Sequence, residues 1–159
     1  MTNNDTAQEL FLLKMGEVVL KGLNRSAFED KLASNVRRRV RAYGDFQVSN
    51  RQSTLYVEPQ DASCDLDGAF AACRQVFGIA AVAKAVPCAK TVEAIFQTAA
   101  SYLKDDFAAA KSFKVESRRA DKLFPMTSIQ LSQAVGGLLA QEFPAVRVDV
   151  HYPDLTVHV

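Results

Sequence analysis

The sequence predicts an α+β protein built from two successive units, and three observations support that prediction. Stretches with apolar residues at helical spacing alternate with short stretches in which every second residue is apolar. In the first half their order is strand, helix, strand, strand, helix, strand, and a new series starts near Pro87. Hydrophobic residues make up 48% and charged residues 23% of the 159 residues, which is typical of a globular chain.

The first half begins with a short apolar strand at residues 10–13. A helix from about residue 24 to 42 follows. Either Asn24 or Ser26 can cap it, and Ser26-x-x-Glu29 at its start has the form of a capping box. One face of this helix is an apolar stripe with a residue at every fourth position: Phe28, Leu32, Val36 and Val40.

A hairpin comes next, because the alternating strands 46–48 and 55–57 flank a polar turn at residues 49–53. A second amphipathic helix at 66–77 and a strand at 79–86 complete the series. The resulting order βαββαβ is the ferredoxin-like pattern.

The second half predicts a further mixed unit. Its expected elements are a helix from Thr91 to Phe107, a strand at 113–117, a helix that begins at Thr127 with the capping box Thr127-x-x-Gln130, and strands at 146–150 and 155–159. We place the first unit at residues 1–78 and the second at 79–159, although the strand at 79–86 could pair with the first sheet. Because the chain stops within an alternating strand, we expect the second unit to lack its last strand.

Gly136 and Gly137 lie off the apolar stripe of the last predicted helix. Each costs about 1 kcal/mol of helix stability relative to alanine. We therefore expect close approach of another backbone there, with a bound ligand as the alternative.

Several kinds of protein are excluded by what the sequence lacks. The three cysteines, Cys64, Cys73 and Cys88, form no Cys-x-x-Cys pair, and the two histidines have no third ligand close in sequence, so we expect no metal site. No paired catalytic residues and no glycine-rich phosphate loop can be recognised, so we expect no catalytic residue and no cofactor. The sequence has neither a secretory signal nor an apolar run long enough for a membrane helix, so the expected location is the cytoplasm.

The charge distribution points towards a polyanionic partner more than the net charge of +1 does. Residues 14–51 contain nine Lys and Arg against four acidic residues, and residues 111–122 contain five against two. Two basic zones on a nearly neutral chain are compatible with a surface that binds a polyanion such as nucleic acid.

The first basic zone contains two candidate sites. Lys14, Lys21 and Arg25 surround the connection between the first strand and the helix. On the helix, Lys31, Arg37, Arg38 and Arg41 lie opposite the apolar stripe. These helix cations are either a row of phosphate contacts or a solvated face whose charge suits the helix C-terminus, and the sequence leaves both interpretations open.

The second basic zone is the more specific. The strand at 113–117, which carries Lys114, leads into Arg118, Arg119 and Lys122 just before a helix N-terminus. Arginine binds phosphate oxygens in a bidentate manner, and helix N-termini favour anions. Phe124 in the same loop either stacks on an unpaired base or packs inward. Asp121 could neutralise one of the three cations.

The segments Lys14–Arg25, Ser117–Lys122 and Phe124–Ser128 resemble the N-terminal region of the tRNA 4-thiouridine synthetases, also called thiamine-biosynthesis sulfurtransferases. The resemblance runs from about residue 10 to 159. It implies an N-terminal ferredoxin-like domain followed by a THUMP domain, which together hold the acceptor stem and the CCA end of tRNA.

The resemblance also implies what this chain does not contain. In that family a following pyrophosphatase-loop domain uses ATP and a cysteine persulfide, which a cysteine desulfurase supplies, and the enzymes are dimers. Neither the pyrophosphatase-loop signature nor the family's catalytic cysteines are found here, so we expect RNA binding without catalysis and without ATP. Two alternatives remain: a THUMP module of an RNA methyltransferase or pseudouridine synthase, and a ferredoxin-like module that binds a small ligand or a protein.

Overall fold

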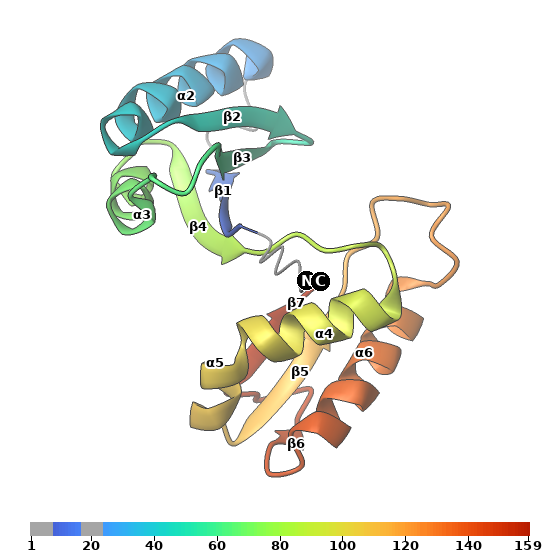
Figure 1. Ribbon diagram of the computed structural model, residues 1–159. Helices are drawn as coiled ribbons and strands as arrows, with labels where there is room; N and C mark the ends of the chain where they lie inside the picture. The colour runs from blue at the N-terminus through green and yellow to red at the C-terminus, as the bar shows by residue number, and fades with distance from the viewer. Residues whose placement is uncertain (1–7, 17–23) are drawn as a thin grey trace, which may run out of the picture. The chain divides into compact units, whose positions relative to one another are not determined.

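The computed structural model describes residues 8–16 and 24–159, and the chain forms two compact units that meet between Pro87 and Cys88 (Figure 1). Within the described residues there are two separate sheets, one of four strands and one of three. The prediction of two α+β units is therefore confirmed. The boundary lies later than residue 78, because β4 (Ile79–Ala85) pairs with β1 (Leu10–Met15) and so belongs to the first sheet.

The first unit has the predicted βαββαβ order. Its sheet has the strand order β2-β3-β1-β4, and all neighbouring strands are antiparallel. The remaining elements are α2 (Arg25–Val40), the short 3-10 helix η1 (Arg41–Tyr43), β2 (Phe46–Arg51), β3 (Thr54–Pro59) and α3 (Leu66–Arg74).

Helices α2 and α3 cover one face of the first sheet (Figure 1). The alternation of the strands explains why: Phe11, Leu13, Leu55 and Val57 point to the helices and are fully buried. From α2 they meet Leu32, Val36 and Val40, as predicted. Two aromatic residues that we expected in this core are on the surface. Phe28 is 54% exposed in the first turn of α2, and Phe77 is 97% exposed because α3 already ends at Arg74.

The start of α2 differs from the expected capping box. The N-cap is Asn24, whose side chain makes no capping hydrogen bond, and Ser26 lies inside the first turn. Glu29 is engaged elsewhere: its carboxylate accepts hydrogen bonds from Asn50 Nδ2 at 2.8 Å and from Ser53 Oγ at 2.9 Å. It therefore ties the helix to the hairpin.

The hairpin turn is tighter than the five residues expected, because β2 and β3 extend to Arg51 and Thr54. Only Gln52 and Ser53 lie between the strands, with φ of 52° and 63°. Two successive left-handed residues match the right-handed twist of a two-residue hairpin. The sequence did not indicate such a turn, because neither residue is the glycine or asparagine that usually occupies it.

The second unit contains α4 (Val92–Tyr102), α5 (Lys104–Ala109), β5 (Ser112–Glu116), α6 (Ser128–Glu142), β6 (Arg147–Val148) and β7 (Leu155–His158). Its sheet has the order β6-β5-β7, and both pairings are parallel. The helix expected from Thr91 to Phe107 is divided into two at Leu103. The strand expected at 146–150 is only two residues long, because the Asp149 side chain accepts the backbone N–H groups of His151 and Tyr152 and starts a turn.

The core of the second unit is built around Phe107. Its ring meets Phe113 edge to face at 5.2 Å between centroids and stacks on Phe143 at 4.2 Å. Leu131, Val135 and Leu139 of α6 close this core. The capping box at the start of α6 is confirmed, since Thr127 and Gln130 bond to each other's backbone N–H.

Candidate nucleic-acid interface

The loop between β5 and α6, residues 117–127, presents the predicted basic cluster. The backbone N–H of Arg118 donates to Val159 O at 2.8 Å, so the loop leaves the sheet at a fixed point. Arg118, Arg119 and Lys122 are all exposed, which confirms that at least two of the three reach solvent. A buried arginine without a partner would be costly, so consecutive cations at a strand end turn outward.

Arg119 holds the loop in shape. Its Nη1 donates to the carbonyl oxygens of Phe124 at 3.4 Å and Met126 at 3.2 Å. Asp121 holds the same loop from within, because its Oδ1 accepts the backbone N–H of Leu123 at 3.0 Å. The loop is therefore braced by its own side chains.

Asp121 does not neutralise the cluster by an ion pair, as one interpretation of the sequence suggested. Its partner is Lys90, at 3.0 Å between Nζ and Oδ2. The backbone N–H of Leu123, with Lys90 next, lowers the pKa of Asp121 below its ordinary value. Among the described residues, the side chains of Arg118 and Lys122 take part in no hydrogen bond or ion pair. Both side chains can therefore reach a ligand, although the charge of Arg118 also acts on Glu116, whose pKa it helps to lower.

The apolar residues of the loop divide between the core and solvent. Phe124 is half-buried and packs against the core of the second unit, so of the two interpretations the inward one is correct. Its neighbour Leu123 is 92% exposed. The sequence analysis overlooked Leu123, although only one of two adjacent apolar residues in a braced turn can point inward.

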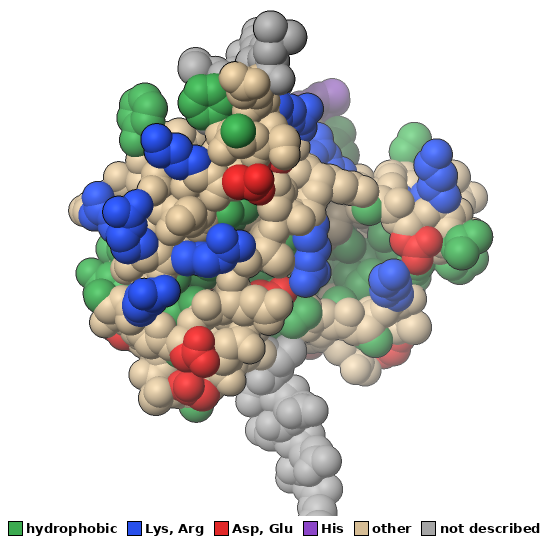
Figure 2. Space-filling view, turned by 90° about the horizontal axis from the view of Figure 1, so that it is seen from above, with side chains coloured by type: hydrophobic (Ala, Val, Ile, Leu, Met, Phe, Trp, Pro, Cys, Tyr) green, Lys and Arg blue, Asp and Glu red, His purple; other side chains and the backbone are tan. Residues whose placement is uncertain are grey.

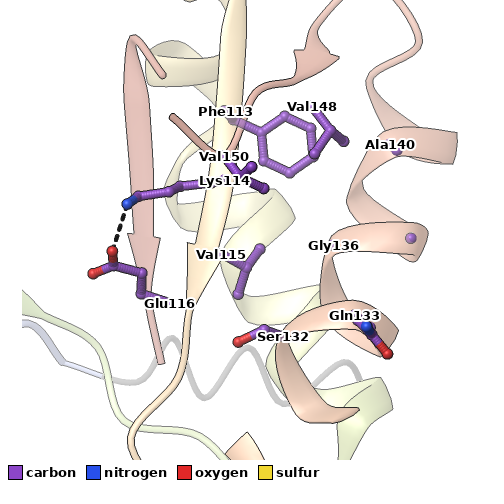
Figure 3. Close-up of a pocket in the computed structure, with 11 residues that line it drawn as sticks. Phe113, Lys114, Val115, Glu116, Ser132, Gln133, Gly136, Ala140, Val148 and Val150 are labelled. Atoms are coloured by element: carbon purple, nitrogen blue, oxygen red, sulfur yellow. Dashed lines mark ion pairs between the residues drawn. The ribbon is translucent and has the colours of Figure 1, made fainter. Parts of the chain in front are cut away.

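Lys114 is compensated and contributes less charge than expected. Its Nζ lies 2.5 Å from Glu116 Oε1, and its side chain is only 24% exposed (Figure 3). The same contact, as the largest cause, lowers the pKa of Glu116. Lys114 is thus a weaker candidate for phosphate binding than Arg118 or Lys122.

Lys114 and Glu116 border a hollow of about 440 Å³ between β5, α6 and the chain after β6 (Figure 3). Gly136 and Gly137 also line it. A Cβ atom on Gly136 would only make an ordinary contact, 3.7 Å from Val115 Cγ2, and one on Gly137 would meet nothing within 4 Å. Our expectation that another backbone packs closely on these glycines is therefore wrong.

The candidate cations on α2 and at its end fall into two groups. Two of them are engaged within the fold: Arg25 bonds Glu29 at 3.0 Å and also Ser53 Oγ, and Arg37 Nη2 donates to Val48 O at 3.1 Å. The outward face of α2 keeps exposed cations, and Figure 2 shows Lys and Arg side chains gathered over the part of the molecule that carries this helix. They include Lys31, Arg38, whose Nη2 donates to Asn35 Oδ1 at 2.7 Å, and Arg41. Lys21 lies outside the described residues.

The engagement of Arg25 can be tested through Glu29. The Arg25 side chain, as the largest cause, lowers the pKa of Glu29 from its ordinary 4.5. A lowered folded pKa means that the ionised carboxylate adds stability above pH 4.5, and that this stability is lost as the pH falls through the folded value. We expect Glu29→Gln to lower the free energy of unfolding at pH 7, by about 1–2 kcal/mol.

The difference between wild type and Glu29→Gln should shrink as the pH falls below 4.5, as measured by urea denaturation at successive pH values. Asp30→Asn is the matched control, because Asp30 is an exposed neighbour on the same helix. A constant difference at every pH would show that Glu29 acts by packing and that Arg25 is free for other partners.

Neither a metal site nor a membrane-spanning helix is found in residues 8–16 and 24–159. No group of three or more His, Cys, Asp and Glu is placed to hold a metal ion. In the same ranges no helix is both long and apolar enough to cross a membrane. Burial raises the pKa of the Cys73 thiol to about 11, so this cysteine is an inert member of the core.

Comparison with known families agrees with the division into two units. The description "ThiI ferredoxin-like domain" matches residues 10–83, and "THUMP domain" matches residues 89–159. The chain therefore belongs to the proteins that join these two domains. Among named relatives, the "Probable tRNA sulfurtransferase" of Acetivibrio thermocellus is 36% identical over 154 residues, and the match covers 96% of this chain. The chain spans 39% of the length of that relative.

Solved structures share the fold. A 4-thiouridine synthetase crystallised with RNA and ATP superposes with a TM-score of 0.77 over 95% of this chain and 38% of its own, at 24% identity. PH1313 from Pyrococcus horikoshii has the same TM-score over 95% of this chain and 50% of its own, at 19% identity. The resemblance noted in the sequence is thus confirmed over nearly the whole chain.

Proposed function

We propose that this chain is the tRNA-docking region of a tRNA sulfurtransferase that makes 4-thiouridine. The observation that carries the proposal is the loop 117–127 of the THUMP domain. There Arg118 and Lys122 are exposed on a braced backbone and make no side-chain hydrogen bond or ion pair with any described residue. Unpaired cations on a fixed loop are suited to binding phosphate oxygens. Such contacts depend on positive charge at a defined position and not on the identity of the base. The acceptor stem and the single-stranded CCA end are the proposed ligands.

The chain's own residues would bind and orient the RNA. The uridine chemistry would take place in the remaining length of such a protein, where a pyrophosphatase-loop domain would hold ATP. We accordingly expect calorimetry to detect no stoichiometric ATP site on this chain. For the full-length protein we propose a cysteine desulfurase as sulfur donor, a homodimeric assembly, a role in thiamine thiazole biosynthesis, and a cytoplasmic location.

Two other functions compete with this one. A THUMP module could serve an RNA methyltransferase or pseudouridine synthase, but the match of residues 10–83 to the ThiI ferredoxin-like domain favours the sulfurtransferase. A ferredoxin-like module that binds a small ligand or a protein would need no uncompensated cations in the loop, and it predicts no salt-dependent affinity for RNA.

The test is a fluorescence titration of the chain with tRNA at increasing salt. Each phosphate that the protein neutralises contributes about −0.7 to −0.9 to the slope of log affinity against log salt. We expect a steep slope, and tighter binding of tRNA with an intact single-stranded 3′ end than of a blunt duplex. Affinity that stays flat as salt rises would refute the docking function.

A further inference from the structure

The face of the first sheet that is turned away from α2 and α3 carries an aromatic residue and two cations. Lys14 on β1, Tyr56 on β3 and Arg51 on β2 alternate with the buried core residues, so their side chains share this face. Lys14 and Arg51 are exposed and Tyr56 is half-buried. Neither α2 nor α3 covers this face (Figure 1).

The guanidinium group of Arg51 lies over the ring of Tyr56. Its guanidinium carbon lies 4.6 Å from the centre of the Tyr56 ring, and its Nη2 lies 3.4 Å from Glu58 Oε1. Tyr56 and Glu58 are neighbours along β3 on the same face, so the arginine crosses the ring to reach the carboxylate. The Arg51 side chain nevertheless remains 58% exposed, so it is accessible to a ligand.

The positions next to this stack on the same face are mostly uncharged. Leu12 pairs with Tyr56 on one side and with Ala83 on the other, so a shallow apolar floor extends across β1 towards β4. Lys14 lies one step along the strand on the same face, and its side chain has no ion pair among the described residues. The floor leads to a hollow of about 260 Å³ lined by residues that include Leu10 and Pro87.

We propose that this open sheet face is a second RNA surface, on which one unpaired nucleotide stacks against the guanidinium plane that Arg51 holds over Tyr56. Unpaired bases stack on aromatic rings and on arginine planes, whereas the bases of a duplex are already stacked on each other. Arg51 and Lys14 together outweigh Glu58, so the face also attracts the phosphates that flank the base. The inference rests on the proposed function, because it names RNA as the occupant.

The experiment uses the whole chain and a short single-stranded RNA that carries one fluorescent 2-aminopurine. Stacking should quench the fluorophore when the protein is added. We expect Tyr56→Leu and Arg51→Lys each to abolish the quenching. Each should also weaken binding of this strand by roughly tenfold, which is the order of affinity that stacking of one base on a protein side chain contributes. Arg51→Lys keeps the charge and removes only the plane, so it separates stacking from electrostatics.

Arg74→Lys is the matched control, because Arg74 also lies over an aromatic ring of this unit, 6.0 Å from the centre of Phe70, but on the helix α3. It should change neither affinity nor quenching. Melting curves of all three variants establish that they fold. Duplex RNA should bind the stacking variants as it binds wild type.

Two results would overturn the inference and leave the proposed function intact. In one, the stacking variants bind the single strand like wild type while Arg118→Ala still loses tRNA affinity. In the other, the variants change only self-association in sedimentation, which would make the face a protein contact. Absence of any RNA binding by the wild-type chain would refute the inference and the proposed function together.

Discussion

Simultaneous Arg118→Ala and Lys122→Ala substitutions are expected to lower the affinity for tRNA by roughly tenfold to a hundredfold at moderate salt, since hydrogen bonds to charged groups contribute about 1.5–3 kcal/mol. Both side chains are free of partners in the described part of the chain, so removing them costs the fold little. The slope of log affinity against log salt should become shallower by about one unit for each cation removed. Titrations at several salt concentrations measure both quantities.

Lys104→Ala is the control, since it removes an exposed cation of the same unit from α5, outside the loop. Arg119→Ala should weaken binding for an additional reason, because Arg119 braces the loop through Phe124 O and Met126 O. If the double variant kept its affinity and instead melted much earlier, the cations would have a structural role. The outward face of α2, with Lys31, Arg38 and Arg41, would then be the surface to test.

Phe107→Ala is expected to destabilise the second unit by about 3–5 kcal/mol, the usual cost of removing a large aromatic side chain from a closed core. Phe107 is 1% exposed and touches both Phe113 and Phe143, so no neighbour can fill the cavity without breaking a ring contact. The first unit has its own core, formed by different residues. Hydrogen exchange in the variant should accordingly rise in residues 88–159 far more than in the first unit.

Phe77→Ala is the comparison for this substitution, because the Phe77 side chain is 97% exposed. It should change stability by less than about 0.5 kcal/mol, as is usual for surface positions. Equal losses in the two variants would mean that Phe77 is covered in solution. Equal exchange throughout the Phe107→Ala chain would mean that the two cores unfold together.

Periodicity predicted the elements well and their ends less well. The βαββαβ order, the capping box of α6 and the outward direction of Arg118, Arg119 and Lys122 followed from local spacing. The end of α3 did not, since nothing in the apolar repeat indicates that Phe77 lies beyond the last turn. The assignment of β4 to the first sheet depends on pairing with β1, which lies about seventy residues earlier in the sequence.

The sequence predicted which cations belong to the candidate site, but not which of them are free to bind a ligand. A list of cations cannot distinguish a free side chain from an engaged one, and the structure separates Arg118 and Lys122 from Lys114, Arg25 and Arg37 by their partners. The stack of Arg51 on Tyr56 was not found from sequence, because it joins two strands across a turn. An outward-facing tyrosine between two buried residues of β3 was the available signal.

The bracing of the loop by Arg119 and Asp121 has a consequence for the speed of recognition. A segment that must fold onto its ligand binds with a large loss of heat capacity and often slowly, whereas a preformed one docks as a rigid body. With its hydrogen bonds already in place, this loop should associate at a rate governed by diffusion and by long-range attraction. Stopped-flow mixing should therefore give a single second-order phase whose rate constant falls with ionic strength, with no slower step that is independent of RNA concentration.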